Sequence, residues 1–181
     1  PILSTKEQDC SHMAFNNLFL RYEKEEETNS IMVERRKRVE GENDIFLGVN
    51  FYTEEETIGE LEYEIDREKF YGRANLNLPQ MIQNSKTLSK KIGFVTDPAI
   101  AIKRTIRIKP EESVQLTLIL AVSNEKEKVK EIIKEYQNGE KIKKVFELAK
   151  VRAMEEARYL GVKGKEIEEA QEILALLLRP N

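Results

Sequence analysis

Hydrophobic and polar positions alternate along much of the first 122 residues, with the period that is typical of β-strands. The alternation predicts strands over residues 17–25, 30–39, 45–52, 59–65, 100–108 and 114–122. The last strand is predicted to bury one face, which is made by Val114, Leu116, Leu118, Leu120 and Val122. In the strand before it, isoleucines alternate with a basic set of Lys103, Arg104, Arg107 and Lys109. The connections are too short for crossover helices, so the strands are predicted to be antiparallel.

After Ser123 the period of the hydrophobic positions becomes helical. A first helix is predicted to begin at a capping pair, Asn124 with Glu127, and to carry an apolar stripe of Val129, Ile132, Ile133 and Tyr136. A second is predicted over residues 140–160, with an inward stripe of Ile142, Val145, Phe146, Ala149, Ala153 and Ala157, and a third over residues 165–178. The pattern therefore predicts an α+β chain, with an antiparallel β-sandwich in residues 1–122 and a three-helix segment in residues 123–181.

The charged residues indicate a well-solvated surface that carries both positive and negative charges. Of the 181 residues 35% are charged, and the formal net charge is -3, which argues against a nucleic-acid partner. The basic run at 35–38 lies between Glu34 and Glu40, so we interpret it as a solvated strand instead of a polyanion site. No apolar run approaches the roughly 18 residues that a membrane span needs, and no membrane segment is expected.

The ends and the cysteine content bear on the origin of the chain. It begins at Pro1 without a signal peptide, so we expect a piece of a longer or trimmed protein. Its single cysteine, Cys10, cannot form an internal disulfide, which fits a cytoplasmic location. Cys10 and His12 together are two ligands short of a structural zinc site.

The sequence contains no recognisable catalytic motif. The sequence has no Gly-rich phosphate loop, no Cys or His cluster and no Ser/His/Asp set, because His12 is its only histidine. The carboxylates at 54–56 lie in a turn-like run, and Asp97 precedes Pro98, where a capping or turn role is expected. We therefore predict no catalytic, cofactor-binding or metal-binding residue in this chain.

The segment DREKFYGRANLNLP, residues 66–79, is the strongest candidate for a binding role. Two aromatic residues, Phe70 and Tyr71, precede Gly72 and Arg73. A guanidinium carries five donors in a fixed fork that suits vicinal hydroxyls or a phosphate. A glycine at the preceding position permits the backbone to present that side chain.

Four segments carry a resemblance to a known family: SHMAFNNLF at 11–19, ERRKR at 34–38, the segment at 66–79, and LSKKIGFVTDPAIAIKRTIRIKPEESVQLTLILAVS at 88–123. Their succession resembles the glycoside phosphorylases of glycoside hydrolase family 94, formerly glycosyltransferase family 36. Within that family it looks most like the phosphorylase-type region of cyclic β-1,2-glucan synthases. This chain differs from the family pattern at Met13, Tyr71 and Glu111, where the family has proline, leucine and glycine.

The resemblance implies a specific place for this chain in a larger enzyme. The family combines a galactose-mutarotase-like β-supersandwich, a helical linker, an (α/α)6 barrel with the catalytic aspartate, and a small C-terminal β-domain. Residues 1–122 would belong to the sandwich and residues 123–181 would be the linker that leads to the barrel. The general acid and the phosphate pocket would lie outside this chain, with phosphate a possible co-substrate of the parent enzyme and no other cofactor implied.

The resemblance also implies a role for two residues, Arg73 and Tyr71. In the family a sandwich loop reaches toward the sugar cleft of the barrel, and Arg73 matches an arginine of that loop. Arg73 would contact substrate hydroxyls of a β-glucan oligosaccharide, and Tyr71 would offer a stacking face. For Arg73 a salt bridge to Asp66 or Glu68, or simple exposure, remains open. For Tyr71 and Phe70 the alternative is a buried role in closing the sandwich.

Two interpretations of function follow. The first is a non-catalytic sandwich and linker that shapes the glucan site and packs on the catalytic barrel. The second is a free-standing carbohydrate-binding module, against which the absence of tryptophan argues. A reading frame that continues beyond Asn181 would favour the first, and a stop codon there the second. A complete enzyme that uses carboxylate pairs is a third, weaker alternative.

Unpaired sheet edges and apolar helix stripes predict a homodimer.

Overall fold

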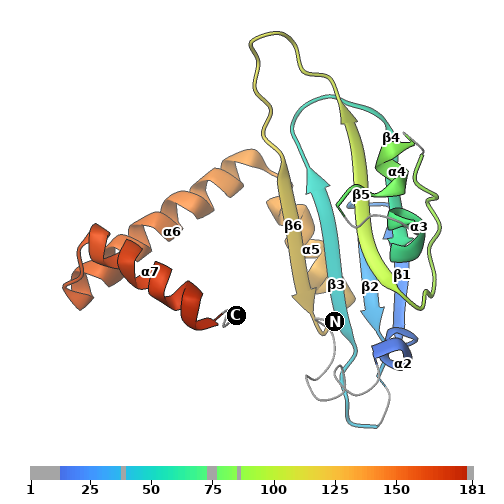
Figure 1. Cartoon of the computed structure of the whole chain (residues 1–181), viewed down its shortest axis with the longest axis horizontal. Coiled ribbons are helices and arrows are strands. Elements are labelled where there is room, and N and C mark those ends of the chain that lie inside the picture. Colours follow the sequence, from blue (N-terminus) through green and yellow to red (C-terminus); the bar gives the residue numbers. More distant parts are fainter. Residues whose placement is uncertain (1–12, 38–39, 73–76, 85–86, 179–181) are drawn as a thin grey trace. The chain divides into compact units, whose positions relative to one another are not determined.

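A four-stranded antiparallel sheet is the larger of two layers in the fold (Figure 1). The computed structural model of the protein describes residues 13–37, 40–72, 77–84 and 87–178. The strands of this sheet are β1 (Leu20–Glu25), β2 (Ser30–Arg35), β3 (Ile45–Tyr52) and β6 (Thr117–Ser123), in the order β1-β2-β3-β6. All neighbours are antiparallel, as the short connections predict.

A two-stranded sheet made of β4 (Thr57–Asp66) and β5 (Pro98–Ile106) forms the second layer. Tyr63 on β4 pairs with Ile102 on β5, so both side chains face the larger sheet. The core between the layers contains Leu20, Tyr22, Ile31, Val33, Leu61, Tyr63 and Ile65. Burial in this core raises the pKa of Tyr22 to about 12. The predicted antiparallel sandwich is thus confirmed.

One side of the sandwich is closed by the segment that leads into β5. The N–H of Lys90 donates to the carbonyl of Tyr63 on β4 at 3.0 Å. Gly93 and Tyr22 on β1 exchange two backbone hydrogen bonds of 2.8 and 2.9 Å. The segment therefore joins the edges of both layers. On the opposite side β5 pairs with β4 alone and β6 with β3 alone within the described residues, which leaves that side open.

The helix α5 (Lys126–Tyr136) covers the other face of the larger sheet. Its fully buried Val129 and Ile133 pack on Met32, Ile119 and Ala121. The stripe predicted for this helix is confirmed. The predicted cap is wrong, because the helix is capped at Glu125, whose N–H donates to the Ser123 hydroxyl at 3.2 Å.

The predicted buried face of β6 is wrong. Leu118, Leu120 and Val122 are 59%, 61% and 52% exposed, whereas Ile119 and Ala121 on the other face are buried under α5. The physical reason is the width of the second layer. Its two strands cover the β1 and β2 side of the larger sheet, and no described strand lies against the inner face of β6. A regular alternation in sequence marks two faces without saying which of them is covered.

Three short helices were not predicted: α2 (Met13–Asn17), α3 (Arg67–Tyr71) and α4 (Gln80–Gln83). Because α2 occupies residues up to 17, the strand predicted from residue 17 begins only at Leu20. Conversely, β3 has the predicted bounds, and β2 ends four residues earlier than the predicted 39.

The chain contains two compact units, Pro1–Asn138 and Gly139–Asn181, so α5 belongs with the sheets. The second unit consists of α6 (Gly139–Leu160) and α7 (Gly164–Leu178), which agree with the predicted helices. Of the inward stripe predicted for α6, Ile142 is buried, whereas Val145 and Phe146 are 42% and 71% exposed.

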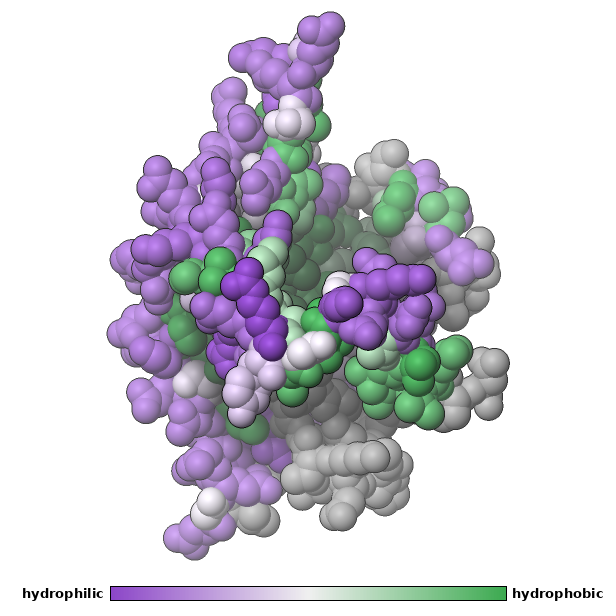
Figure 2. Space-filling view, turned by 90° about the vertical axis from the view of Figure 1, so that its left-hand side faces the viewer, coloured by the Kyte–Doolittle hydropathy of each residue, from purple (hydrophilic) through white to green (hydrophobic). Residues whose placement is uncertain are grey.

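Figure 2 shows hydrophilic residues over much of the face that it draws, with hydrophobic residues beside them. Within the described ranges, no helix has both the length and the apolar character that crossing a bilayer requires.

Candidate functional site

The candidate segment begins where β4 turns directly into the helix α3. Asp66 is the last residue of β4 and caps the helix, since its side chain accepts a hydrogen bond from the Lys69 N–H at 3.3 Å. The ammonium of Lys69 lies 2.7 Å from the other carboxylate oxygen. Burial would raise the pKa of Asp66, but the hydrogen bonds and charge of Lys69 outweigh burial and lower it. Asp66 is therefore held as a carboxylate.

Gly72 ends α3 in a conformation that favours glycine. Its φ is 70°, and its N–H donates to the Glu68 carbonyl at 2.8 Å. A Cβ at this position would lie 2.9 Å from Cβ of Gln80, which shows how closely α4 approaches the turn. Gly72 thus has the positive φ that glycine adopts at low cost, and it follows a helix and not the end of a strand.

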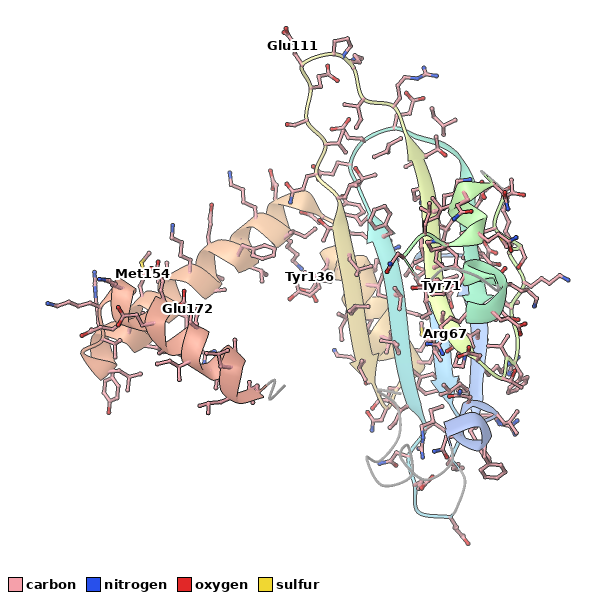
Figure 3. All side chains as sticks on the ribbon, in the orientation of Figure 1. Arg67, Tyr71, Glu111, Tyr136, Met154 and Glu172 are labelled. Carbon is pink, nitrogen blue, oxygen red and sulfur yellow. The ribbon has the colours of Figure 1, made fainter. Side chains whose placement is uncertain are left out.

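Tyr71 and Phe70 are half-buried and contact each other at the end of α3. Their ring centroids are 5.3 Å apart, and the ring planes meet at 84°, an edge-to-face arrangement. Figure 3 shows Tyr71 and Arg67 on this helix beside the β4–β5 layer. Arg73, the other predicted binding residue, lies outside the described residues. The substrate contacts expected of Arg73 and Tyr71 stay predictions.

Arg67 ties the start of α3 to the residue before β5. Its Nε lies 3.0 Å from Oδ2 of Asp97, and its backbone N–H donates to the Asp97 carbonyl at 3.0 Å. Asp97 thus binds the first residue of α3 through both its side chain and its backbone carbonyl. The Asp66–Lys69 and Arg67–Asp97 pairs therefore hold the N-terminal part of this short helix.

Glu64 is a buried carboxylate that the sequence analysis did not identify. It is fully buried and lies on the side of β4 opposite to Tyr63 and Ile65. One carboxylate oxygen accepts from the N–H groups of Ile65 and Asp66, at 3.0 and 3.1 Å. The other oxygen has no hydrogen-bond partner in the described part of the chain. The sequence predicted a strand over residues 59–65, and no local signal in it indicated a buried carboxylate.

A hollow of about 660 Å³ runs along β5 beside the candidate segment. Apolar side chains dominate its walls: Phe51, Phe70, Met81, Ile82, Leu88, Ile100, Ile102, Ile106 and Leu116. Phe70 is thus shared between the candidate segment and the hollow, whereas Tyr71 is not among the described lining residues. Arg104 is a basic residue in this lining.

The described residues contain no group of three or more His, Cys, Asp or Glu side chains that could hold a metal ion. Cys10 and His12 lie outside these residues. The side chains that α3 and its surroundings present are aromatic edges and paired charges. Such groups can bind and orient a ligand, and they do not include an activated nucleophile with its base.

Two facing antiparallel sheets, with α5 on the outer face and further helices after it, define the class of molecule: a β-sandwich domain followed by a helical segment. The sequence matches the glycosyl hydrolase 94 supersandwich domain over residues 1–139, and the chain belongs to this family. The family resemblance inferred from the sequence is confirmed.

A curated relative is the cyclic beta-(1,2)-glucan synthase NdvB of Rhizobium meliloti (strain 1021). The two sequences are 26% identical over 182 residues, which cover the whole of this chain. The chain spans only 6% of the length of that relative.

Proposed function

We propose that this chain is a non-catalytic sandwich and helical-linker part of a longer carbohydrate-active enzyme of the glycoside phosphorylase or glucan synthase type. In that enzyme it packs on a catalytic barrel and forms part of the rim of a β-glucan site. Catalysis, with phosphate as a possible co-substrate, belongs to the barrel. The match to the supersandwich domain carries this proposal, together with the name of the much longer relative.

The segment around α3 supports the proposed rim. The cap at Asp66 fixes the start of the helix and Gly72 ends it at a positive φ, so the backbone leaves α3 through a defined turn. A fixed backbone reduces the entropy that a binding side chain loses when it meets its ligand. We therefore assign Arg73 as a hydrogen-bond donor to glucan hydroxyls, with Tyr71 or Phe70 as an aromatic edge beside it.

The experiment compares Arg73→Ala with a matched control, Arg67→Ala, in the complete protein whose gene encodes this sequence. Loss of a charged hydrogen bond to a ligand costs about 1.5–3 kcal/mol, so Arg73→Ala should lower kcat/KM for β-1,2-glucans by about ten- to hundred-fold. Arg67→Ala removes an exposed pair, worth at most about 1 kcal/mol of folding stability, and should change kcat/KM little.

Equal kinetics for the Arg73 and Arg67 variants would remove Arg73 from the proposed site. A stop codon directly after Asn181 would contradict the larger proposal, because no catalytic barrel would then follow this chain.

A further inference from the structure

Glu64 is a buried carboxylate that the proposed function does not use. It lies near the end of β4, two residues before the cap of α3, and its side chain is completely buried. Burial of a carboxylate is costly unless hydrogen bonds compensate it, and one of its two oxygens has no partner within the described residues. An apolar side chain could fill the same space at lower cost, so what distinguishes Glu64 is the pair of hydrogen bonds that it accepts.

Both hydrogen bonds go to the junction between β4 and α3. Oε1 of Glu64 accepts from the N–H of Ile65 at 3.0 Å and from the N–H of Asp66 at 3.1 Å. The pairing of β4 with β5 shifts its register between Glu64 and Asp66, so the regular ladder of the sheet is interrupted here. The carboxylate therefore supplies an acceptor at the place where the sheet stops offering a regular one.

The cap of α3 lacks one of the usual partners. In a capping box the N–H of the N-cap residue is bonded by a Glu or Gln side chain three residues further on. In α3 the N-cap is Asp66 and that position is Lys69, whose ammonium carries donors only. Glu64 binds the Asp66 N–H from the strand side instead. Asp66 in turn accepts from the Lys69 N–H at 3.3 Å, so a chain of hydrogen bonds runs from Glu64 through Asp66 into the helix.

The helix at the end of this chain of hydrogen bonds depends on outside contacts. It has five residues, and so short a helix is not stable in water by itself. It carries Phe70 and Tyr71, whose rings meet edge to face at 5.3 Å and which the proposed function places at the rim of the glucan site. The direction in which α3 leaves β4 therefore determines where these two rings lie.

We propose that Glu64 is a positioning residue of the glucan rim. Through the N–H of Asp66 it fixes the start of α3 and, with the helix, the rings of Phe70 and Tyr71. It does not touch the substrate itself, because its carboxylate is buried. This role rests on the proposed function, in which α3 belongs to the rim.

The first measurement uses the 181-residue chain and no sugar. Glu64→Met fills nearly the same space without an acceptor. Hydrogen exchange of the backbone amides of Asp66 and Lys69, followed by NMR, should become at least about tenfold faster in this variant, because the helix opens more often. Glu64→Gln keeps an amide oxygen that can accept both hydrogen bonds, and it should retain the slow exchange.

A control and a rescue variant accompany this measurement. Glu60→Met is the matched control, because Glu60 lies on the same strand and its side chain is 83% exposed, and it should leave the exchange rates unchanged. The rescue adds Lys69→Glu to Glu64→Met. A glutamate at position 69 completes the capping box, so it should restore slow exchange at Asp66 but not at Ile65.

The second measurement is the kinetics of the complete protein whose gene encodes this sequence. Glu64→Met should raise KM for β-1,2-glucans about tenfold with little change in kcat, because only part of the molecules then holds α3 in the binding conformation. Glu64→Gln and Glu60→Met should keep the wild-type KM. A purely structural role of Glu64 would instead lower the urea midpoint of unfolding and leave KM unchanged.

Wild-type exchange rates in Glu64→Met would overturn the positioning role without affecting the Arg73 experiment. So would a Glu64→Gln protein that behaves like Glu64→Met, since the two hydrogen bonds would then not be what matters. An unchanged KM in Glu64→Met, where Arg73→Ala does lower kcat/KM, would separate α3 from the rim and also overturn it. An unchanged kcat/KM in both variants would contradict the proposed function and the positioning role together.

Discussion

Gly48→Ala should destabilise the domain through the contact between β3 and α5. The position that a Cβ would take at Gly48 is 2.6 Å from Cγ1 of Val129 and closer still to Cδ1 of Ile133. Both residues are fully buried, and valine in a helix has one strongly preferred rotamer, so Val129 cannot turn away at low cost. The added methyl group must therefore displace α5 or force Ile133 from its rotamer.

The size of the stability loss in Gly48→Ala follows from two opposed effects. Overpacking a core typically costs about 1–3 kcal/mol. Replacing a strand glycine by alanine returns about 0.5–1 kcal/mol, because glycine loses more backbone entropy on folding. We expect a net loss of about 1–2 kcal/mol. With a urea dependence of about 2 kcal/mol/M, the unfolding midpoint should fall by about 0.5–1 M.

The assay is urea unfolding of the 181-residue chain, followed by the near-ultraviolet circular dichroism of its tyrosines. Gly164→Ala is the matched control, because no heavy atom lies within 4 Å of a Cβ at that helical position, and it should not lower stability. Ile133→Val removes the Cδ1 atom and should cost about 0.5–1.5 kcal/mol alone. The loss of stability in the double variant should be smaller than the sum of the losses in the two single variants.

A Gly48→Ala protein as stable as the wild type would refute the close approach of α5 to β3. Strict additivity in the double variant would refute the assigned clash with Ile133, even if Gly48→Ala itself were destabilising.

Three other predictions concern the candidate segment, catalysis and assembly. Asp66→Ala should lower the free energy of unfolding by about 1 kcal/mol near pH 7, because it removes the cap of α3. The pKa of Asp66 is lower in the folded protein than in the unfolded chain. The stabilisation by its carboxylate is therefore complete above the unfolded pKa of about 3.9 and is lost as the pH falls through the folded pKa. Urea titrations at pH 7 and pH 3 should therefore show wild type and variant converging in acid, and a constant difference would contradict the assignment. The isolated chain should release no glucose 1-phosphate from sophorose or longer β-1,2-glucans, and turnover that is lost on mutating a carboxylate of this chain would disprove its non-catalytic role. The homodimer expected from the open edges of β5 and β6 should appear in sedimentation equilibrium over a hundredfold concentration range, where a 21.1 kDa monomer throughout would exclude it.

The sequence predicted the elements of the fold better than their environment. β3 has the predicted bounds, and the helical stripe of Val129 and Ile133 is buried as expected, because periodicity reports which residues share a face. It does not report what lies opposite that face. Leu120 and Phe146 were assigned to the interior because they are apolar, yet both are exposed. For Leu120 the reason is that the layer facing its sheet has only two strands.

The candidate segment shows a different limit of sequence analysis. The helix α3 has five residues, too few for a helical period, and its one local signal is the Asp66 cap. Glu64 was not singled out, and Arg104 was wrongly grouped with the basic residues opposite the isoleucines, although it lies on the same face of β5 as Ile102. Charged residues on strands are normally exposed, and only the packing around these two marks them as unusual. The local residues marked the segment at 66–79 as a candidate, and the resemblance to a family supplied the roles predicted for Arg73 and Tyr71.

The distance in sequence between β3 and α5 has a consequence for synthesis on the ribosome. The meander of β1, β2 and β3 is complete at Tyr52, but the helix that covers its outer face ends only at Tyr136. At about 5–20 residues per second, the face around Met32 and Gly48 stays uncovered for several seconds while the intervening residues are added. A nascent chain of this length therefore exposes an apolar sheet to solvent before its own helix can reach it, and chaperone binding should be strongest in that interval.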